Sequence, residues 1–374
     1  MKVLVTGGAG FIGQHTVRAL LERGDEVRVV DALTQPVHAL GATFHIEGAE
    51  CIRGDVRDKD SWGAWLSGVE AVAHLAAYQD YMPDFSTFFS VNAVGTALLY
   101  EVIVERRLDV GRVVVASSQS VYGEGAARCD THGVLVPEQR TAEQLVRAAW
   151  DVTCPRCGGP VTPVPTPETF AEPRNAYGIS KLAAETAALA LGAQHGIPTA
   201  ALRFAIVHGV GQSPRNAYSG LLRSVCLGLL AGRAPVVFED GAQLRDYVAI
   251  DDVVAATLVA LDHPGAPGAA YNVGGARSWS VLEVIDAVNR IVPEPQPPVL
   301  SGEYRVGDVR HTIGDLSRLR GLGWEPVTDL TRTWRAYWEW LASTGTSGVT
   351  VEQAYEEMRR RGVLRPAARS GGTV

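Results

Sequence analysis

The N-terminal segment of the chain contains a strand, a glycine-rich turn, a helix and a second strand, in that order. Val3-Leu4-Val5 predicts a short buried strand, and Thr6-Gly7-Gly8-Ala9-Gly10-Phe11-Ile12-Gly13 then opens a helix. Glycines at these positions permit a tight turn and let the backbone approach a pyrophosphate, which the free N–H groups at the start of the helix bind. The order of these elements predicts a dinucleotide-binding βαβ unit.

The second strand of this unit, Val27-Arg28-Val29-Val30, ends in Asp31. An acidic residue about 20 positions after the glycine-rich turn is typical of a site that binds the adenosine ribose hydroxyls. Because a carboxylate here would repel a 2′-phosphate, we expect NAD rather than NADP as the cofactor. The cofactor-binding residues predicted in this unit are Gly7, Gly10, Phe11, Ile12, Gly13 and Asp31.

Strand-like runs alternate with helical ones over the first 205 residues. Residues 69–75, 112–117 and 199–205 predict strands, and residues 86–106 and 179–195 predict helices between them. This alternation predicts an α/β protein with a Rossmann-like doubly wound parallel sheet. Ligands bind at the carboxyl ends of the strands in such sheets. We therefore predict further cofactor contacts from residues at strand ends, namely Asp55, Val56, Leu75, Ala76 and Ala77.

The alternation loosens after residue 205, which predicts a change of domain. We assign residues 1–205 to an NAD-binding domain that carries a Cys- and Pro-rich insertion at 124–173. Residues 206–342 mainly form a smaller, discontinuous α+β substrate-binding lobe, and residues 343–374 form a C-terminal helix and tail. The tail holds one short amphipathic segment, 351–361, and we expect the end of the chain to be disordered.

Composition excludes some classes of partner. The chain of 374 residues has a net charge of −7 and no basic run, so we expect no nucleic-acid binding. The glycine-rich turn begins within seven residues of Met1, which leaves no room for a signal peptide. No apolar run approaches the length of a membrane span by inspection, so we expect a cytoplasmic protein without a membrane partner.

A tyrosine and a lysine four residues apart, in Tyr177-Gly-Ile-Ser-Lys181, lie on one face of a predicted helix. The ammonium can sit beside the phenol and favour its ionised form, so that the phenol acts as a base near neutral pH. Such a pair alone is a weak signal, because surface helices often carry one. With the dinucleotide unit and the hydroxyl of Ser118 upstream, we predict a hydride-transfer site with Ser118, Tyr177 and Lys181 as its catalytic residues.

Several motifs together resemble the extended short-chain dehydrogenase/reductase family and, within it, the NAD-dependent sugar-nucleotide epimerases and dehydratases. The resemblance covers about residues 1–342 and is nearest to the dTDP-L-rhamnose 4-epimerase-like and UDP-glucose 4-epimerase-like members. It implies that Ser118 hydrogen-bonds the reacting hydroxyl, that Tyr177 exchanges its proton, and that Lys181 holds the nicotinamide ribose. It also implies a cofactor contact by Asn92 and diphosphate contacts by Arg245 and Arg305.

The two residues after Ser118 help to separate the reactions of this family. Dehydratases resemble one another in having Asp-Glu there, whereas this chain has Gln119 and Ser120. Elimination of water lacks its acid and base, so we predict these two residues to contact substrate, and we expect an epimerase acting at C4 of a nucleotide-linked hexose or deoxyhexose. Two alternatives remain open: a sugar-nucleotide ketoreductase or dehydrogenase with net redox, and a non-catalytic NAD-binding sensor. Ile206 replaces an asparagine that family members usually carry, so substrate contacts should differ there.

The insertion carries two pairs of metal-ligating residues. Cys129-Asp-Thr-His132 and Cys154-Pro-Arg-Cys157 each separate two ligands by two residues, and Cys-Pro-x-Cys-Gly makes the tight turn that zinc knuckles use. Three thiolates and one imidazole would give a closed, structural zinc site. The alternative is that these are free thiols that pack in a loop.

The resemblance also implies a homodimer. Members of this family often dimerise through a four-helix contact, and the predicted helices at 86–106 and 179–195 are the candidates.

Overall fold

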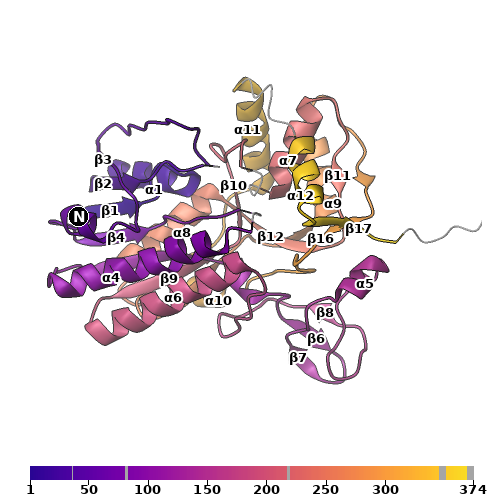
Figure 1. The fold of residues 1–374 in the computed structure, drawn as a ribbon, viewed down its shortest axis with the longest axis horizontal. Helices are drawn as coiled ribbons and strands as arrows, with labels where there is room; N and C mark the ends of the chain where they lie inside the picture. The colour runs from indigo at the N-terminus through magenta and orange to yellow at the C-terminus, as the bar shows by residue number, and fades with distance from the viewer. Residues whose placement is uncertain (36, 81–82, 217–219, 345–350, 369–374) are drawn as a thin grey trace, which may run out of the picture.

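Seven parallel strands form the central sheet of the protein (Figure 1). A computed structural model describes residues 1–35, 37–80, 83–216, 220–344 and 351–368. Adjacent strands pair in parallel throughout this sheet, which confirms the predicted fold class. In spatial order the strands are β13 (Ala270–Val273), β9 (Thr199–Phe204), β5 (Arg112–Ser118), β4 (Ala71–His74), β1 (Lys2–Thr6), β2 (Glu26–Asp31) and β3 (Ala49–Arg53).

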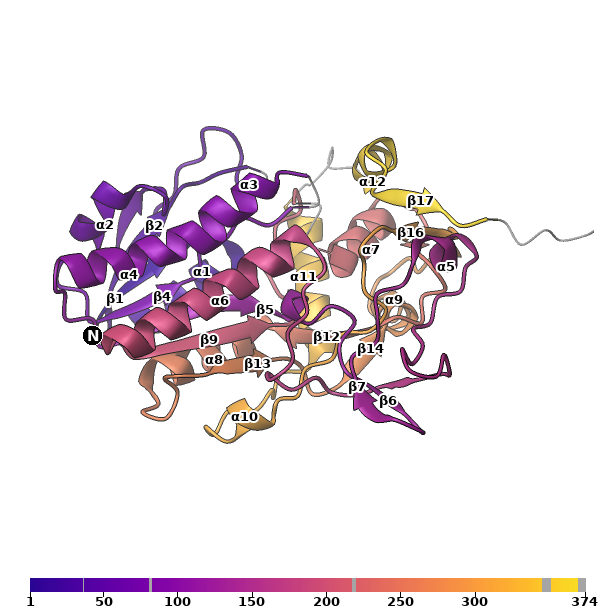
Figure 2. The same cartoon turned by 60° about the horizontal axis from the view of Figure 1, so that its bottom comes forward.

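Helices cover both faces of the sheet, because successive side chains of its buried strands point to opposite sides. On β1, Val3 and Val5 belong to one apolar core and Leu4 to the other. The first core lies under α1 (Phe11–Glu22), α8 (Ile250–Asp262) and α10 (Ser317–Arg320). The second lies under α2 (Lys59–Trp65), α4 (Gly95–Glu105) and α6 (Ala176–His195), which Figure 2 shows on the near side.

One helical run on this second face corresponds to the helix predicted at 86–106, and it is more apolar than the sequence analysis expected. It combines α3 (Phe85–Phe88), a π-helical turn η1 (Phe89–Val94) and α4. Among the described residues, the run Phe85–Glu105 alone reaches the length and hydropathy of a membrane span, with a mean hydropathy of 1.5. About 44% of that window is buried within the protein, and the core helix of a globular protein meets the same criteria.

The second lobe is built from elements after β9 and has its own apolar core. Strand β13 and helix α8 return to the first sheet, so the lobe is interrupted along the chain. Its elements are β10 (Ile206–His208), α7 (Gly220–Leu230), β11 (Val236–Val237), β12 (Leu244–Ala249), β14 (Ser278–Ser280), α9 (Val281–Asn289), β15 (Val299–Leu300), β16 (Glu303–Arg305) and α11 (Leu330–Ser343).

The insertion at 124–173 forms a small unit beside the second lobe (Figure 2). It contains a three-stranded antiparallel sheet and a short helix. Thr141 caps that helix by accepting a hydrogen bond from the Gln144 N–H. The elements are β6 (Ala127–Cys129), β7 (Gly133–Leu135), α5 (Ala142–Val146) and β8 (Thr162–Pro163), in the sheet order β7-β6-β8.

The C-terminal segment returns to the second lobe after α11. Residues 351–360 form α12 (Val351–Arg360), as the amphipathic pattern predicted. The chain then forms β17 (Leu364–Pro366), which pairs antiparallel with β16. The sequence analysis anticipated no strand here, and residues 369–374 lie outside the described part of the chain.

Candidate active site

The glycine-rich turn between β1 and α1 forms a cradle that only glycine fits at two positions. Gly7 has a φ of +70°, and a Cβ on it would lie 2.7 Å from the Ala76 nitrogen. A Cβ on Gly13 would meet the Gly7 carbonyl and lie 2.6 Å from the Cα of Gly8. The backbone is therefore open where helix α1 begins, and the free N–H groups there suit a pyrophosphate.

Asp31 lies at the end of β2, beside this turn. Its carboxylate accepts a hydrogen bond from the Ala9 N–H at 3.0 Å and another from the Leu33 N–H at 2.8 Å. The side chain is thereby held at the cleft wall. A carboxylate fixed there suits ribose hydroxyls and disfavours a 2′-phosphate, so the residues of this cradle fit NAD.

A single cleft of about 1050 Å³ brings together most of the residues predicted from the sequence. Its size suits a dinucleotide together with a second ligand. Its walls include Gly7, Gly10, Phe11, Ile12, Gly13, Asp31, Asp55, Val56, Leu75, Ala76, Ala77, Ser118, Gln119, Ser120, Tyr177, Lys181, Arg245 and Arg305.

Asn92 is the exception among the predicted cofactor contacts, because it does not line this cleft. Its side chain is buried, accepts a hydrogen bond from the Tyr78 N–H at 2.8 Å and donates to the Ser180 hydroxyl at 2.9 Å. It also donates to the Tyr78 carbonyl. Asn92 therefore ties the segment after β4 to α6, and it shapes the cleft from behind.

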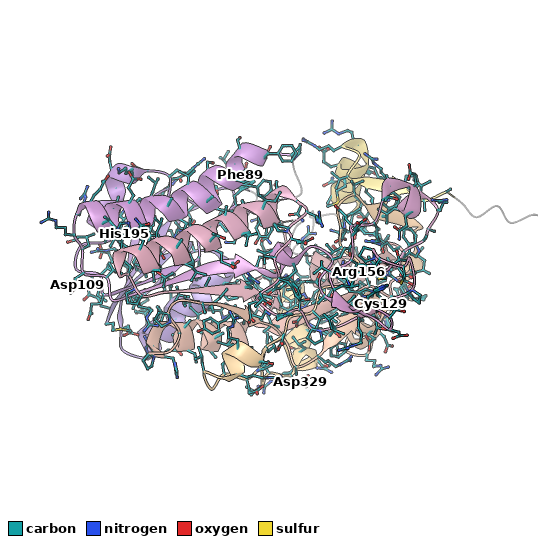
Figure 3. All side chains as sticks on the ribbon, turned by 90° about the horizontal axis from the view of Figure 1, so that it is seen from below. Phe89, Asp109, Cys129, Arg156, His195 and Asp329 are labelled. Carbon is teal, nitrogen blue, oxygen red and sulfur yellow. The ribbon has the colours of Figure 1, made fainter. Side chains whose placement is uncertain are left out.

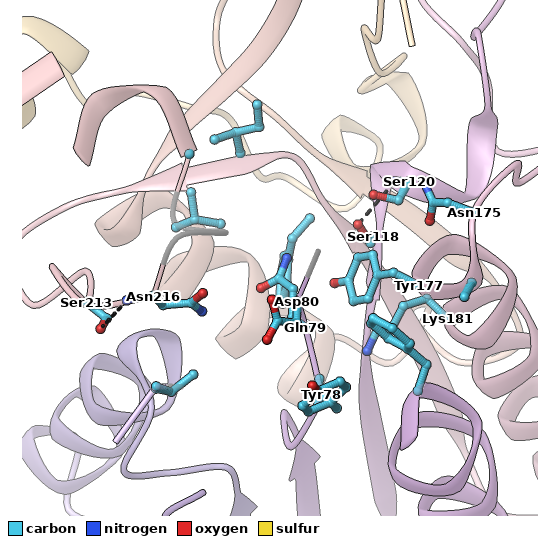
Figure 4. Close-up of a pocket in the computed structure, with 18 of the residues that line it drawn as sticks. Tyr78, Gln79, Asp80, Ser118, Ser120, Asn175, Tyr177, Lys181, Ser213 and Asn216 are labelled. Atoms are coloured by element: carbon cyan, nitrogen blue, oxygen red, sulfur yellow. Dashed lines mark hydrogen bonds between the residues drawn. The ribbon is translucent and has the colours of Figure 1, made fainter. Parts of the chain in front are cut away.

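Ser118, Tyr177 and Lys181 face the same cavity from two elements (Figure 4). Ser118 is the last residue of β5, and Tyr177 and Lys181 lie one turn apart on α6. The Asn175 side chain caps α6 by accepting a hydrogen bond from the Gly178 N–H at 2.8 Å. Gly178 lets the helix approach the main chain at Ser120, where a Cβ would meet the Ser120 carbonyl. The sequence thus fixes the start of α6 and its distance from β5.

The protonation of these groups differs from the expectation in one respect. Burial raises the pKa of Tyr177 to about 12, and a hydrogen bond with Ser118 lowers it in part. Burial also lowers the pKa of Lys181 to about 8, with the Glu185 carboxylate acting in the opposite direction. The expected depression of the phenol pKa by Lys181 is not seen: burial disfavours the phenolate, and only the hydrogen bond with Ser118 acts against it.

Gln119 and Ser120 begin the turn η2 (Gln119–Tyr122) directly after Ser118. The Ser118 hydroxyl accepts a hydrogen bond from the Ser120 N–H at 3.1 Å, which orients it. Within the described residues, the Gln119 Oε1 atom is buried and has no hydrogen-bond partner. A buried amide oxygen that accepts no hydrogen bond costs free energy unless a bound ligand donates one. The position of Gln119 therefore suits a substrate contact.

The two predicted phosphate-binding arginines line the cleft from the second lobe. Arg245 donates to the carbonyls of Arg310 at 2.8 Å and Val309 at 2.7 Å, and it reaches Asp308 at 3.3 Å. Arg305 lies 3.5 Å from the Asp308 carboxylate. These contacts hold both guanidinium groups at the wall, where they suit a diphosphate.

Two functional features were missed from the sequence. Arg203, in the buried strand β9, forms an ion pair with Glu185 at 2.6 Å, and the same carboxylate accepts a hydrogen bond from Ser117 at 2.6 Å. An arginine in an apolar strand was the available signal. The other feature is the lining of the cleft by Tyr355, Met358 and Arg361, near the end of the chain, for which the sequence gives no signal beyond amphipathicity.

The four predicted metal ligands lie together at the outer end of the insertion, where Figure 3 labels Cys129. All four ligand atoms are within 4.8 Å of one another. The Cys129 and Cys157 sulfurs are 3.8 Å apart, and His132 Nδ1 lies 3.7 Å from Cys129 and 3.5 Å from Cys154. The group lies away from the cleft.

Hydride chemistry at a carbinol carbon needs a dinucleotide cradle and a proton-transfer group in one cleft. This fold provides both, which places the chain in the class of NAD-dependent short-chain dehydrogenases/reductases. More narrowly, the chain belongs to the NAD dependent epimerase/dehydratase family, whose model matches residues 3–143 and 156–274. The residues between these two segments lie in the insertion.

Two relatives and one solved structure illustrate the similarity. A dTDP-L-rhamnose 4-epimerase of Burkholderia thailandensis is 35% identical over 354 residues, which cover 91% of this chain and 95% of that protein. A UDP-glucose 4-epimerase of Mycolicibacterium smegmatis is 31% identical, covering 88% of this chain and 95% of the relative. The structure of MoeE5 with UDP-glucuronic acid and NAD is 30% identical with a TM-score of 0.72, covering 92% of this chain and all (100%) of that one.

Proposed function

We propose that the protein is an NAD-dependent epimerase that inverts C4 of a nucleotide-activated hexose or deoxyhexose through a 4-keto intermediate. One observation carries the proposal: Ser118, Tyr177 and Lys181 line the same cleft as the dinucleotide cradle. Relatives and neighbours with this family's fold support it, because they are named as 4-epimerases of dTDP- and UDP-sugars.

The residues of the cleft assign the individual tasks. The cradle of Gly7, Gly13 and Asp31 would hold NAD, which supplies the acceptor and donor of hydride when bound. The ionised form of Tyr177 takes the proton of the C4 hydroxyl as that carbon is oxidised, and it returns that proton to the oxygen when the ketone is reduced on its other face. Ser118 holds the reacting oxygen, and the Lys181 cation stabilises negative charge on the phenol oxygen.

Gln119 and Ser120 favour epimerisation over elimination. Neither side chain can remove a C5 proton or protonate a leaving C6 hydroxyl as a carboxylic acid pair would. The carbinol therefore undergoes oxidation and reduction only. A ketoreductase with net redox would use the same residues, and it differs in exchanging its cofactor with solvent at each turnover.

The experiment that tests this function is incubation with a panel of UDP-, dTDP- and GDP-hexoses in deuterated water, followed by NMR and by absorbance at the NADH band. A C4 epimer without net NADH and without carbon-bound deuterium supports direct return of the hydride. Net NADH formation would favour the dehydrogenase, and no reaction with any sugar would favour a sensor. dTDP-6-deoxyhexoses belong in the panel because of the 35% identical relative.

We propose in addition that Cys129, His132, Cys154 and Cys157 bind a structural zinc ion. Tetrahedral zinc with Zn–S of about 2.3 Å and Zn–N of about 2.0 Å separates two sulfurs by about 3.8 Å and a sulfur from a nitrogen by about 3.5 Å. The observed separations of 3.8, 3.7 and 3.5 Å agree with these values.

The backbone of the insertion supports the same conclusion. Cys154 and Gly159 form a tight turn, in which the Cys154 N–H donates to the Gly159 carbonyl at 2.8 Å. Cys129 ends β6 and His132 immediately precedes β7, so the second pair sits in a facing hairpin turn. Elemental analysis of protein expressed with zinc should give about one zinc per chain. A value near zero would leave the four side chains as packed thiols and an imidazole.

We propose a homodimer through α4 and α6, which lie side by side on one face of the sheet (Figure 2). Their outer surface carries exposed apolar side chains at Val94, Val104 and Ile179. An apolar surface across two adjacent helices is suited to a second copy of the same pair. Light scattering of the protein and of Ile179→Glu tests this, and a monomeric wild type would refute it.

A further inference from the structure

The end of the chain forms part of the cleft. We call α12 and β17, residues 351–366, the C-terminal arm. Figures 1 and 2 show the arm beside α7 and β16 of the second lobe. Tyr355, Met358, Arg361, Gly362 and Val363 of this segment line the same cleft as the catalytic residues. The matched part of the family model ends at residue 274, well before the arm.

Specific contacts hold the arm in place. The Arg359 guanidinium donates to both oxygens of the Glu303 carboxylate, at 2.6 and 2.8 Å. Strand β17 pairs with β16, and the Val306 N–H donates to the Val363 carbonyl at 2.9 Å. Val351 is buried in the core of the second lobe. The arm is thus docked on the strand that carries the predicted phosphate contact Arg305.

The part of the cleft beside the arm has an aromatic and apolar wall. The ring of Tyr355 lies edge-on to that of Phe238, with centroids 5.2 Å apart. The Arg305 guanidinium lies 5.4 Å from the centroid of the same Phe238 ring. Met358, three residues after Tyr355 on α12, also lines the cleft. Aromatic and thioether side chains offer good contacts to a planar heteroaromatic base.

Positive charge gathers around this wall. Arg245, Arg305 and Arg361 all line the cleft. The Glu357 carboxylate, and more weakly those of Asp84 and Asp80, raise the pKa of Arg361. The guanidinium is ion-paired with Glu357 of α12 and stays cationic. Guanidinium groups in such a position suit an anionic diphosphate.

We propose that the C-terminal arm completes the nucleotide subsite of the substrate: Tyr355 and Met358 contact the base, and Arg361 contributes positive charge toward the diphosphate. The ligand class is a nucleoside diphosphate, free or linked to a sugar. The inference rests on the proposed function only in taking a nucleotide sugar as the substrate. It assigns these residues no part in the chemistry at C4.

The test uses the full-length holoenzyme and three single variants, Tyr355→Ala, Met358→Ala and Arg361→Met. The dissociation constants of UDP and dTDP are measured by calorimetry, together with KM, kcat and bound NAD. Removal of one side chain from a ligand pocket should weaken nucleotide binding about tenfold or more and raise KM by a similar factor. Bound NAD and kcat should be unchanged. The control is Arg360→Met, whose wild-type side chain is 74% exposed and does not line the cleft.

A charge swap outside the cleft distinguishes a loss of nucleotide binding from a loss of folding. Arg359→Glu should release the arm and weaken UDP and dTDP binding, and adding Glu303→Arg should restore the affinity by re-forming the ion pair in reverse. Wild-type affinity in the three cleft variants, or in Arg359→Glu, would overturn the inference. If nucleotide affinity follows the arm but no nucleotide sugar is turned over, the proposed function fails while the subsite stands.

Discussion

Replacing Tyr177 with Phe removes one hydroxyl from the candidate site and little else. The residue is 9% exposed, and its ring packs against Phe88 with centroids 6.3 Å apart, a contact that phenylalanine keeps. The pKa of the phenol is raised to about 12 by burial, so the hydroxyl is protonated at neutral pH. The proton that moves between substrate and enzyme in our mechanism passes through this oxygen.

The size of the effect follows from that role. Loss of a positioned acid–base group slows the chemical step by about 10²- to 10⁴-fold, or about 3 to 5 kcal/mol of activation free energy. The NMR assay of epimer formation measures it, and the absorbance of denatured protein measures bound NAD, which should match the wild type. Burial disfavours the ionised phenol, which is the form that accepts the proton. The wild-type rate should therefore rise with pH up to the pKa of Tyr177 in the enzyme–substrate complex.

Tyr100→Phe is a matched control, because it also removes a buried tyrosine hydroxyl, hydrogen-bonded to Thr199 at 2.9 Å, from a residue that does not line the cleft. Its kcat should equal that of the wild type. A Tyr177→Phe enzyme that retains turnover within tenfold of the wild type, or one that loses NAD as well as turnover, would refute the reasoning.

Three further results are expected. Cys154→Ser should lower the zinc content well below one per chain while Cys51→Ser leaves it unchanged, and equal zinc in both variants would contradict the proposed ligands. Arg203→Met leaves its buried carboxylate partner unpaired, so the free energy of unfolding should fall by about 3 to 5 kcal/mol, and a melting temperature within about one degree of the wild type would be inconsistent with this. Burial raises the pKa of Asp246 from 3.8 to about 7, so the folded state favours its protonated form and the protein loses stability as pH rises through this range. The melting temperature of the wild type should therefore fall relative to Asp246→Asn between about pH 4 and about pH 7, and a constant difference would show that the burial of Asp246 has no such effect.

Local chemistry in the sequence was enough to predict the dinucleotide cradle. The glycines after β1 and the carboxylate of Asp31 act through backbone geometry and charge within one βαβ unit, so their spacing along the chain carries the information. The same holds for Tyr177 and Lys181, which a helix places one turn apart whatever surrounds it. The two Cys-containing pairs are also local turns.

Properties that depend on distant contacts were decided only by the tertiary structure. Desolvation of Tyr177 raises its pKa, and no pattern of residues reports how much water the surrounding elements exclude. The family resemblance implied that Asn92 contacts the cofactor. Its hydrogen bonds to Tyr78 and Ser180 show instead that it lies behind the wall of the cleft.

The difference between what the sequence predicts and what the structure shows is largest for segments that are distant in sequence and meet in the fold. The two turns of the insertion come together because β6 and β7 form a hairpin that faces the Cys154 turn, and only that meeting brings the four candidate ligand atoms within 4.8 Å of one another. The C-terminal arm reaches the cleft through pairing of β17 with β16, more than fifty residues away in sequence. Sequence by itself determined the units whose partners are near neighbours along the chain, and the tertiary structure decided those whose partners are brought together by burial of a shared core.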